Sequence, residues 1–150
     1  FLGRQYRLKV EQGGKAPAKL RGKFLYVAVP DKTDIASVKK VVDAWYRRQA
    51  EQTFQRYLEK CTEITSRHGV PTPDIKLRRM RTRWGSCNSK GGITLNTHLV
   101  QAPVHCIEYV IMHELCHRLH SNHSRQFYAL LSRCMPDWQR RKDVLDKFKL

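Results

Sequence analysis

Two short segments near the start of the chain combine aromatic and branched apolar residues with polar ones, a composition typical of β-strands. They are residues 5–10 and residues 23–29. Gly13, Gly14 and Gly22 lie between them, and Pro30 follows the second segment. Because glycine clusters favour turns, this pattern predicts two strands joined as a β-hairpin.

Apolar residues then recur mostly at three- and four-residue spacing as far as Arg67, which predicts one long helix or two helices in succession. Thr33 or Asp34 can cap its first turn with a side-chain oxygen. The apolar stripe consists of Ile35, Val38, Val42, Trp45, Phe54, Tyr57, Leu58, Cys61 and Ile64. The segment His68-Gly69-Val70-Pro71-Thr72-Pro73 ends the helical pattern, because it contains one glycine and two prolines.

In the second half of the chain, strand-like segments are again followed by a helical pattern. Residues 75–84 and 93–96 are expected to be strands, separated by Gly91 and Gly92. Helices are expected after Pro103 through Leu119, over about 124–133, and from Pro136 onward. The order ββ-α-ββ-ααα predicts an α+β fold with a small antiparallel or mixed sheet.

Composition narrows the choice of partners and compartment. The 150 residues suggest one domain over 1–150, and 29 Lys and Arg against 13 Asp and Glu leave a net charge of +16. This excess favours anionic partners such as nucleic acid or nucleotides. No apolar run reaches the roughly 18 residues of a membrane span, so no membrane partner is expected. Five cysteines without a CxxC pair favour reduced thiols and a cytoplasmic protein. The chain begins at Phe1 without a methionine, which leaves open a preceding N-terminal segment.

Residues 113–123 contain the candidate chemistry, with the sequence His-Glu-Leu-Cys-His-Arg-Leu-His-Ser-Asn-His. His113 and His117 are four residues apart on a predicted helix, so both imidazoles lie on one face and can bind one Zn²⁺ ion. Glu114 then lies beside the first ligand, where a carboxylate can act as general base on a water molecule bound to the zinc. The pattern therefore predicts a hydrolase with one catalytic zinc.

The third ligand has two candidates, His120 and His123. His120 shares the helical face of the first two, but seven residues of straight helix place it about 10.5 Å from His113. A turn at Ser121-Asn122 would instead return His123 toward the metal from outside the helix. We therefore expect His123 to be the third ligand, with a fourth position left open for water.

The whole chain closely resembles the YgjP-like metallopeptidase family. The resemblance rests on residues 83–87, 92–96 and 107–117, and on His123-Ser124 with Phe127 and the sequence Met135-Pro136-Asp137-Trp138. Residues 44–47 with Ala50, and residues 1–6, are similar as well. A more distant similarity connects the chain with the SprT and WLM zinc peptidases, which act on proteins attached to DNA. The resemblance implies a compact zincin fold, His113, His117 and His123 as zinc ligands, and Glu114 as catalytic acid and base.

Other polar residues are candidates for substrate or anion binding. On a strand over 75–84, Arg79, Arg81 and Arg83 would share one face and could bind an acidic or phosphate-bearing ligand, although a solvated face is an equal alternative. Asn96 could offer its amide to the cleft, or stabilise a turn. Tyr109 lies one turn before His113 and is a candidate to stabilise an oxyanion, with a packing role as the alternative.

Three functions are consistent with these features. The first is a zinc metallopeptidase that cleaves protein or peptide substrates. A variant of this hypothesis is that it acts on proteins close to nucleic acid. The second is a metal-dependent phosphohydrolase or pyrophosphatase that acts on nucleotides, since the same activated water can attack phosphorus. The third is a basic DNA-binding module with structural zinc, which an open water position and Glu114 argue against.

Overall fold

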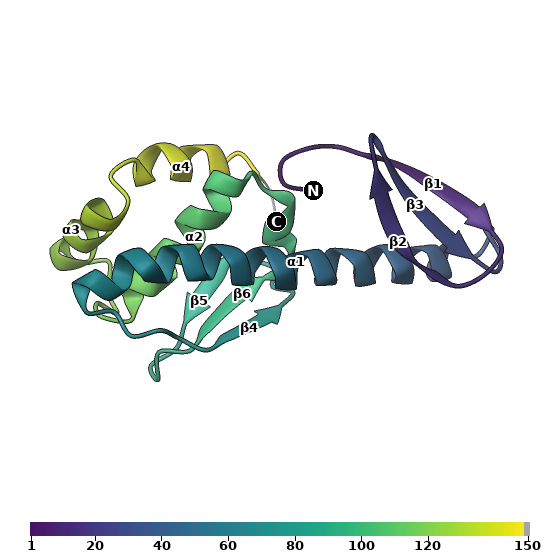
Figure 1. Ribbon diagram of the computed structural model, residues 1–150. Helices are drawn as coiled ribbons and strands as arrows, with labels where there is room; N and C mark the ends of the chain where they lie inside the picture. The colour runs from purple at the N-terminus through teal and green to yellow at the C-terminus, as the bar shows by residue number, and fades with distance from the viewer. Residues whose placement is uncertain (149–150) are drawn as a thin grey trace.

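The computed structural model describes residues 1–148, so the last two residues of the expected domain lie outside it. Two groups of elements lie along one long helix, α1 (Ile35–Thr65). Figure 1 shows a small sheet against the first half of α1, and a second sheet with three helices against its other half. At 1.5 Å per residue the 31 residues of α1 extend about 46 Å, enough to contact both groups.

The first sheet contains three strands, β1 (Arg7–Gln12), β2 (Ala16–Arg21) and β3 (Phe24–Val29). Their order is β1-β3-β2, with β1 parallel and β2 antiparallel to the central strand β3. The predicted two-strand hairpin is therefore wrong. The strand expected over 23–29 is present as β3, but the predicted turn contains a further strand, β2, whose alternation is interrupted by Pro17 and by a shift in register. The most apolar strand occupies the centre, and the charged strands form the edges.

The second group of elements carries the HExxH sequence. Strands β4 (Ile75–Arg78), β5 (Gly85–Cys87) and β6 (Ile93–Asn96) form a mixed sheet with β6 at its centre. A 3₁₀ helix, η2 (Thr97–Gln101), leads into α2 (Val104–His117), followed by α3 (Arg125–Cys134) and α4 (Trp138–Leu145). A short 3₁₀ turn, η1 (Ser66–His68), ends the long helix. The predicted α+β class is confirmed.

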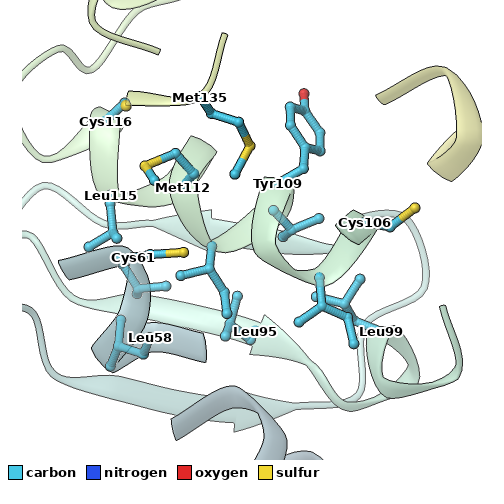
Figure 2. Packing of buried hydrophobic residues seen from close by; sticks show 14 of the residues in the cluster. Leu58, Cys61, Leu95, Leu99, Cys106, Tyr109, Met112, Leu115, Cys116 and Met135 are labelled. Carbon is cyan, nitrogen blue, oxygen red and sulfur yellow. The ribbon is translucent and has the colours of Figure 1, made fainter. Parts of the chain in front are cut away.

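Helix α2 is buried along most of its length. Its residues Met112, Leu115 and Cys116 are fully buried. Leu115 points toward Cys61 and Leu58 of α1, whereas Met112 and Cys116 lie on the side of Met135 (Figure 2). A smaller apolar cluster joins Leu25, Val27 and Val29 of β3 to Trp45 of α1. Because α2 is held on several sides, the side chains that it directs toward the outside have fixed positions.

Two further expectations concern the cysteines and the membrane. All five cysteines are free thiols, in line with the expected absence of disulfides. Within residues 1–148, no helix is both long and apolar enough to cross a membrane.

Candidate metal and active site

Three imidazole rings converge at the end of α2. The Nε2 atoms of His113, His117 and His123 lie 3.1, 3.1 and 3.2 Å from one another. Ligands about 2.1 Å from a tetrahedral ion lie about 3.4 Å apart, so the three atoms are spaced nearly as one small cation requires. Among the described residues 1–148, no other group of three metal-ligating side chains comes this close together.

The chain reverses direction between α2 and α3, and this reversal brings His123 to the other two rings. Helix α2 ends at His117, and one further turn follows, in which the His120 N–H donates to the Cys116 carbonyl. The chain bends at Ser121 and Asn122. Ser124 then caps α3 by accepting a hydrogen bond from the Phe127 N–H at 3.2 Å. His120 supplies no ring atom to the cluster.

Backbone contacts orient the second imidazole. Nδ1 of His117 lies 2.9 Å from the carbonyl oxygen of His120, which can only accept a hydrogen bond. The proton of a neutral His117 ring therefore resides on Nδ1, and the lone pair on Nε2 faces the other two rings. Three ring nitrogens directed at one point can each donate a lone pair to a cation between them, so the donor set fits a metal ion.

Phe127 of α3 lies beside all three imidazoles and is fully buried. Its ring stacks on His117 with centroids 4.4 Å apart, and it meets His113 and His123 edge-on at 5.0 and 5.1 Å. Burial, together with the neighbouring imidazoles, lowers the pKa of His113 to about 3, and burial also lowers the pKa of His117. Both rings are therefore neutral at pH 7, as metal binding requires.

Tyr109 also contacts the cluster, but not on the side expected for an oxyanion-stabilising group. Its hydroxyl lies 3.4 Å from Nδ1 of His113, whereas the Nε2 atom of that ring faces the other histidines. The side chain is buried, and burial raises its pKa. Tyr109 therefore contacts the back of an imidazole ring, and its role in stabilising an oxyanion stays a prediction beside the packing alternative.

Glu114 lies under strand β5 with only 6% of its surface exposed. Burial raises the pKa of its carboxyl group to about 7, and the nearby Arg83 guanidinium partly opposes this shift. The strand passes so closely that a Cβ atom at Gly85 would lie 3.0 Å from Glu114 Cγ and 3.2 Å from Val110 Cγ1. A glycine at position 85 therefore leaves room for the carboxylate.

An open cavity of about 570 Å³ connects these groups. Glu114 and the three histidines form one side, and the strand β5 with the turn after it forms the other. Arg118 holds that turn in place by donating a hydrogen bond to the Gly91 carbonyl. Besides Glu114, the three histidines and the residues of β5, the cavity is lined by Arg83, Asn88, Ser89 and Ser121.

The predicted row of three arginines is not present. Strand β4 ends at Arg78, because β6, its partner, ends at Asn96 and leaves the following residues without a strand to pair with. Arg83 alone lines the cavity. Arg79 instead contacts Nδ1 of His98 at 2.9 Å, and Arg81 is exposed.

Asn96 holds the irregular segment after β4. Its side-chain amide donates to the carbonyls of Met80 at 2.9 Å and Arg83 at 2.8 Å, and its oxygen accepts from the His98 N–H. The residue is fully buried. Asn96 therefore supports the chain beside the cavity rather than facing a ligand, so the expectation that it offers its amide to the cleft is wrong and the turn-stabilising alternative holds.

Comparison with known proteins agrees with this geometry. Residues 1–148 match the family described as YgjP-like, metallopeptidase domain. The chain belongs to the YgjP-like family. Its fold is similar to that of the metallopeptidase zymogen abylysin of Pyrococcus abyssi, at 22% identity and a TM-score of 0.54 over 63% of this chain and 90% of that one. Comparison with curated proteins gives no match.

The family assigns this YgjP-like chain to the metal-dependent peptidases, and its fold is that of a metallopeptidase. The sequence predicts site roles for the histidines and Glu114, but none for Phe127 or Gly85. Aromatic residues and glycines occur at many structural positions, so neither residue carries a signal of its own. Their roles depend on contacts with residues that are distant in the sequence.

Proposed function

We propose that this chain is a zinc-dependent peptidase, in which His113, His117 and His123 hold the metal and Glu114 acts as the general acid and base. The observation that carries the proposal is the convergence of three Nε2 atoms within 3.2 Å of one another, beside a buried carboxylate. Three protein ligands leave a position open, which is typical of catalytic rather than structural zinc sites.

Three imidazole ligands favour zinc over calcium or magnesium, which prefer oxygen ligands. When bound, the ion would lower the pKa of a coordinated water molecule and polarise the substrate carbonyl. The residues around it then keep the ligands in place. Phe127 supports all three rings, the His120 carbonyl orients His117, and the Tyr109 hydroxyl contacts His113.

Glu114 would take a proton from the attacking water and pass it to the leaving amine. Its carboxyl group lies in the cavity wall next to His113 and His117. Efficient proton transfer needs a pKa close to the working pH, and burial brings the pKa of Glu114 to about 7. Arg83 lies close enough to stabilise the carboxylate form.

The substrate would bind as an extended chain along β5. This strand is an edge of its sheet, and its three residues line the cavity opposite the histidines. An exposed strand edge can pair with a peptide through backbone hydrogen bonds, which give affinity without strict sequence specificity. A bound peptide would then pass between β5 and the three imidazoles.

The test is cleavage of an unfolded protein, such as casein, by zinc-loaded enzyme and by Glu114→Gln. Glutamine keeps the size of the side chain but cannot accept the proton, so the rate should fall by about 10²–10⁴-fold while the zinc content stays at one ion per chain. The matched control is Glu63→Gln, an exposed position on α1, which should cleave like the parent.

The same assay includes a nucleoside triphosphate, because the sequence also allows a phosphohydrolase. Release of phosphate or pyrophosphate that depends on Glu114, without cleavage of any protein, would replace the peptidase by that second reaction. Zinc binding without Glu114-dependent hydrolysis of either substrate would instead favour a binding module with structural zinc.

A further inference from the structure

A second concave surface lies between the two groups of elements, away from the histidine cluster. It consists of two cavities of about 560 and about 430 Å³ that share Tyr46, His98 and Gln101. Its walls are the N-terminal segment 1–6, helix α1, Trp84 together with Arg79, and η2. We call this surface the waist groove; helix α1, which forms one of its walls, connects the two sheets (Figure 1).

Aromatic rings line one part of the waist groove. Trp84 and His98 stack with centroids 5.9 Å apart and planes inclined by 21°. Tyr46 packs edge-on against Trp45, and both Tyr46 and Tyr6 line the same cavity. These groove-lining rings are half-buried, so each is supported by the protein while part of it remains accessible.

Basic side chains line the rest of the waist groove. Arg4 belongs to one cavity, and Lys39, Arg47 and Arg79 belong to the other, where Asp43 is the one acidic lining residue. Arg79 reaches the stacked rings, since its Nη1 atom lies 2.9 Å from Nδ1 of His98. Arg47 also pairs with Glu51 at 3.4 Å, but both side chains are more than half exposed, so water weakens this ion pair.

We propose that the waist groove binds single-stranded nucleic acid, with bases stacked on its aromatic rings and phosphates beside its basic side chains. Proteins that bind single-stranded nucleic acid combine basic side chains, which contact the phosphates, with accessible aromatic rings on which the bases stack. An acidic peptide would satisfy the charges but would make no use of the partly accessible rings of Tyr6 and Tyr46. The basic groups extend over both cavities, which favours a strand over a single nucleotide.

This binding function goes beyond the proposed peptidase chemistry and does not require it. The two sites meet at the segment that Asn96 supports, where Arg83 faces the metal-site cavity and Trp84 faces the waist groove. No waist-groove residue belongs to the histidine cluster. Binding is therefore measurable in the Glu114→Gln variant, whether or not that variant has lost hydrolysis.

The experiment is fluorescence anisotropy with a labelled oligothymidylate of about 15 nucleotides, titrated with Glu114→Gln protein at several salt concentrations. We expect a Kd on the order of 1–100 µM near physiological salt, and a log–log salt slope near −3 for about four phosphate contacts. Arg79→Ala should weaken binding and reduce the slope by about 0.7, because one counterion-releasing contact is lost. Tyr46→Leu should raise the Kd about tenfold through lost stacking.

Matched controls are Arg133→Ala on α3 and Tyr26→Leu on β3, which lie outside the groove and should bind like the parent. The proposal is overturned if no binding occurs, or if Arg133→Ala weakens binding as much as Arg79→Ala, which would indicate a diffuse basic surface. It is also overturned if polyglutamate or a nucleoside triphosphate competes as well as unlabelled oligothymidylate does.

Discussion

Nδ1 of His117 lies 2.9 Å from the backbone carbonyl of His120, three residues further along the chain. The contact uses no side-chain atom of His120, yet it determines which nitrogen of His117 carries the proton. The residue that the sequence offered as a rival metal ligand thus contributes to the site through its backbone. Its side chain should be dispensable.

His120→Ala and His123→Ala should therefore behave differently toward zinc. The first substitution preserves the carbonyl and should leave zinc affinity within a few-fold of the parent. The second removes one of three converging Nε2 atoms, and affinity should fall by more than about a hundredfold, since even indirect partners contribute 10–100-fold. Competition with a chromophoric chelator measures both. Equal losses in the two variants would contradict the assignment of His123.

Removal of the metal should abolish peptide hydrolysis. Addition of zinc should restore this activity. Dialysis against a chelator leaves the three imidazoles without a cation, while the apolar core beneath them remains buried. Far-UV circular dichroism should therefore change little, although thermal stability should fall because bound metal stabilises the folded state. Full activity in protein shown to be free of transition metals would disprove the mechanism.

Tyr109→Phe tests the contact behind His113. The hydroxyl lies 3.4 Å from Nδ1, at the long end of hydrogen-bond geometry, so its loss should weaken zinc binding by no more than about tenfold. Tyr26→Phe, on β3 of the other sheet, serves as the control. A Tyr109→Phe enzyme with unchanged zinc affinity but a rate lowered about a hundredfold would instead favour the oxyanion role.

Asn96→Ala should reduce the free energy of unfolding by about 2–4 kcal/mol, because two carbonyls and one N–H lose their partner in a fully buried position. Asn122→Ala, at an exposed bend, should change stability by less than about 0.5 kcal/mol. Chemical denaturation of both variants measures the difference. Similar values for the two would show that Asn96 does not support the segment after β4.

Gly85→Ala should lower the rate of hydrolysis more than it lowers zinc content. The added methyl group would lie 3.0 Å from Glu114 Cγ, which must move if the strand stays in place. Overpacking of this kind costs about 1–3 kcal/mol, so the variant should still fold. An unchanged rate in the presence of bound zinc would show that the position of Glu114 is less restricted than its burial indicates.

Periodicity located most of the helices and the central strands, because these elements bury one regular face. The long helix, predicted to begin near Thr33 or Asp34, starts at Ile35 after the Asp34 cap and ends at Thr65. Edge strands were harder to predict. β2 is mostly exposed, and the expected strand over 75–84 was too long, because strand length depends on a pairing partner that periodicity does not reveal.

The sequence by itself determined which residues can do chemistry here, since four-residue spacing on a helix places His113, Glu114 and His117 together through local geometry alone. It also determined the α+β class and the positive charge. Only the tertiary structure decided the rest: that Arg79 and Arg83 face different cavities, that Asn96 is structural, and that Phe127 supports the rings. These relationships join residues from separate elements, and packing between elements depends on three-dimensional contacts that spacing along one chain does not contain.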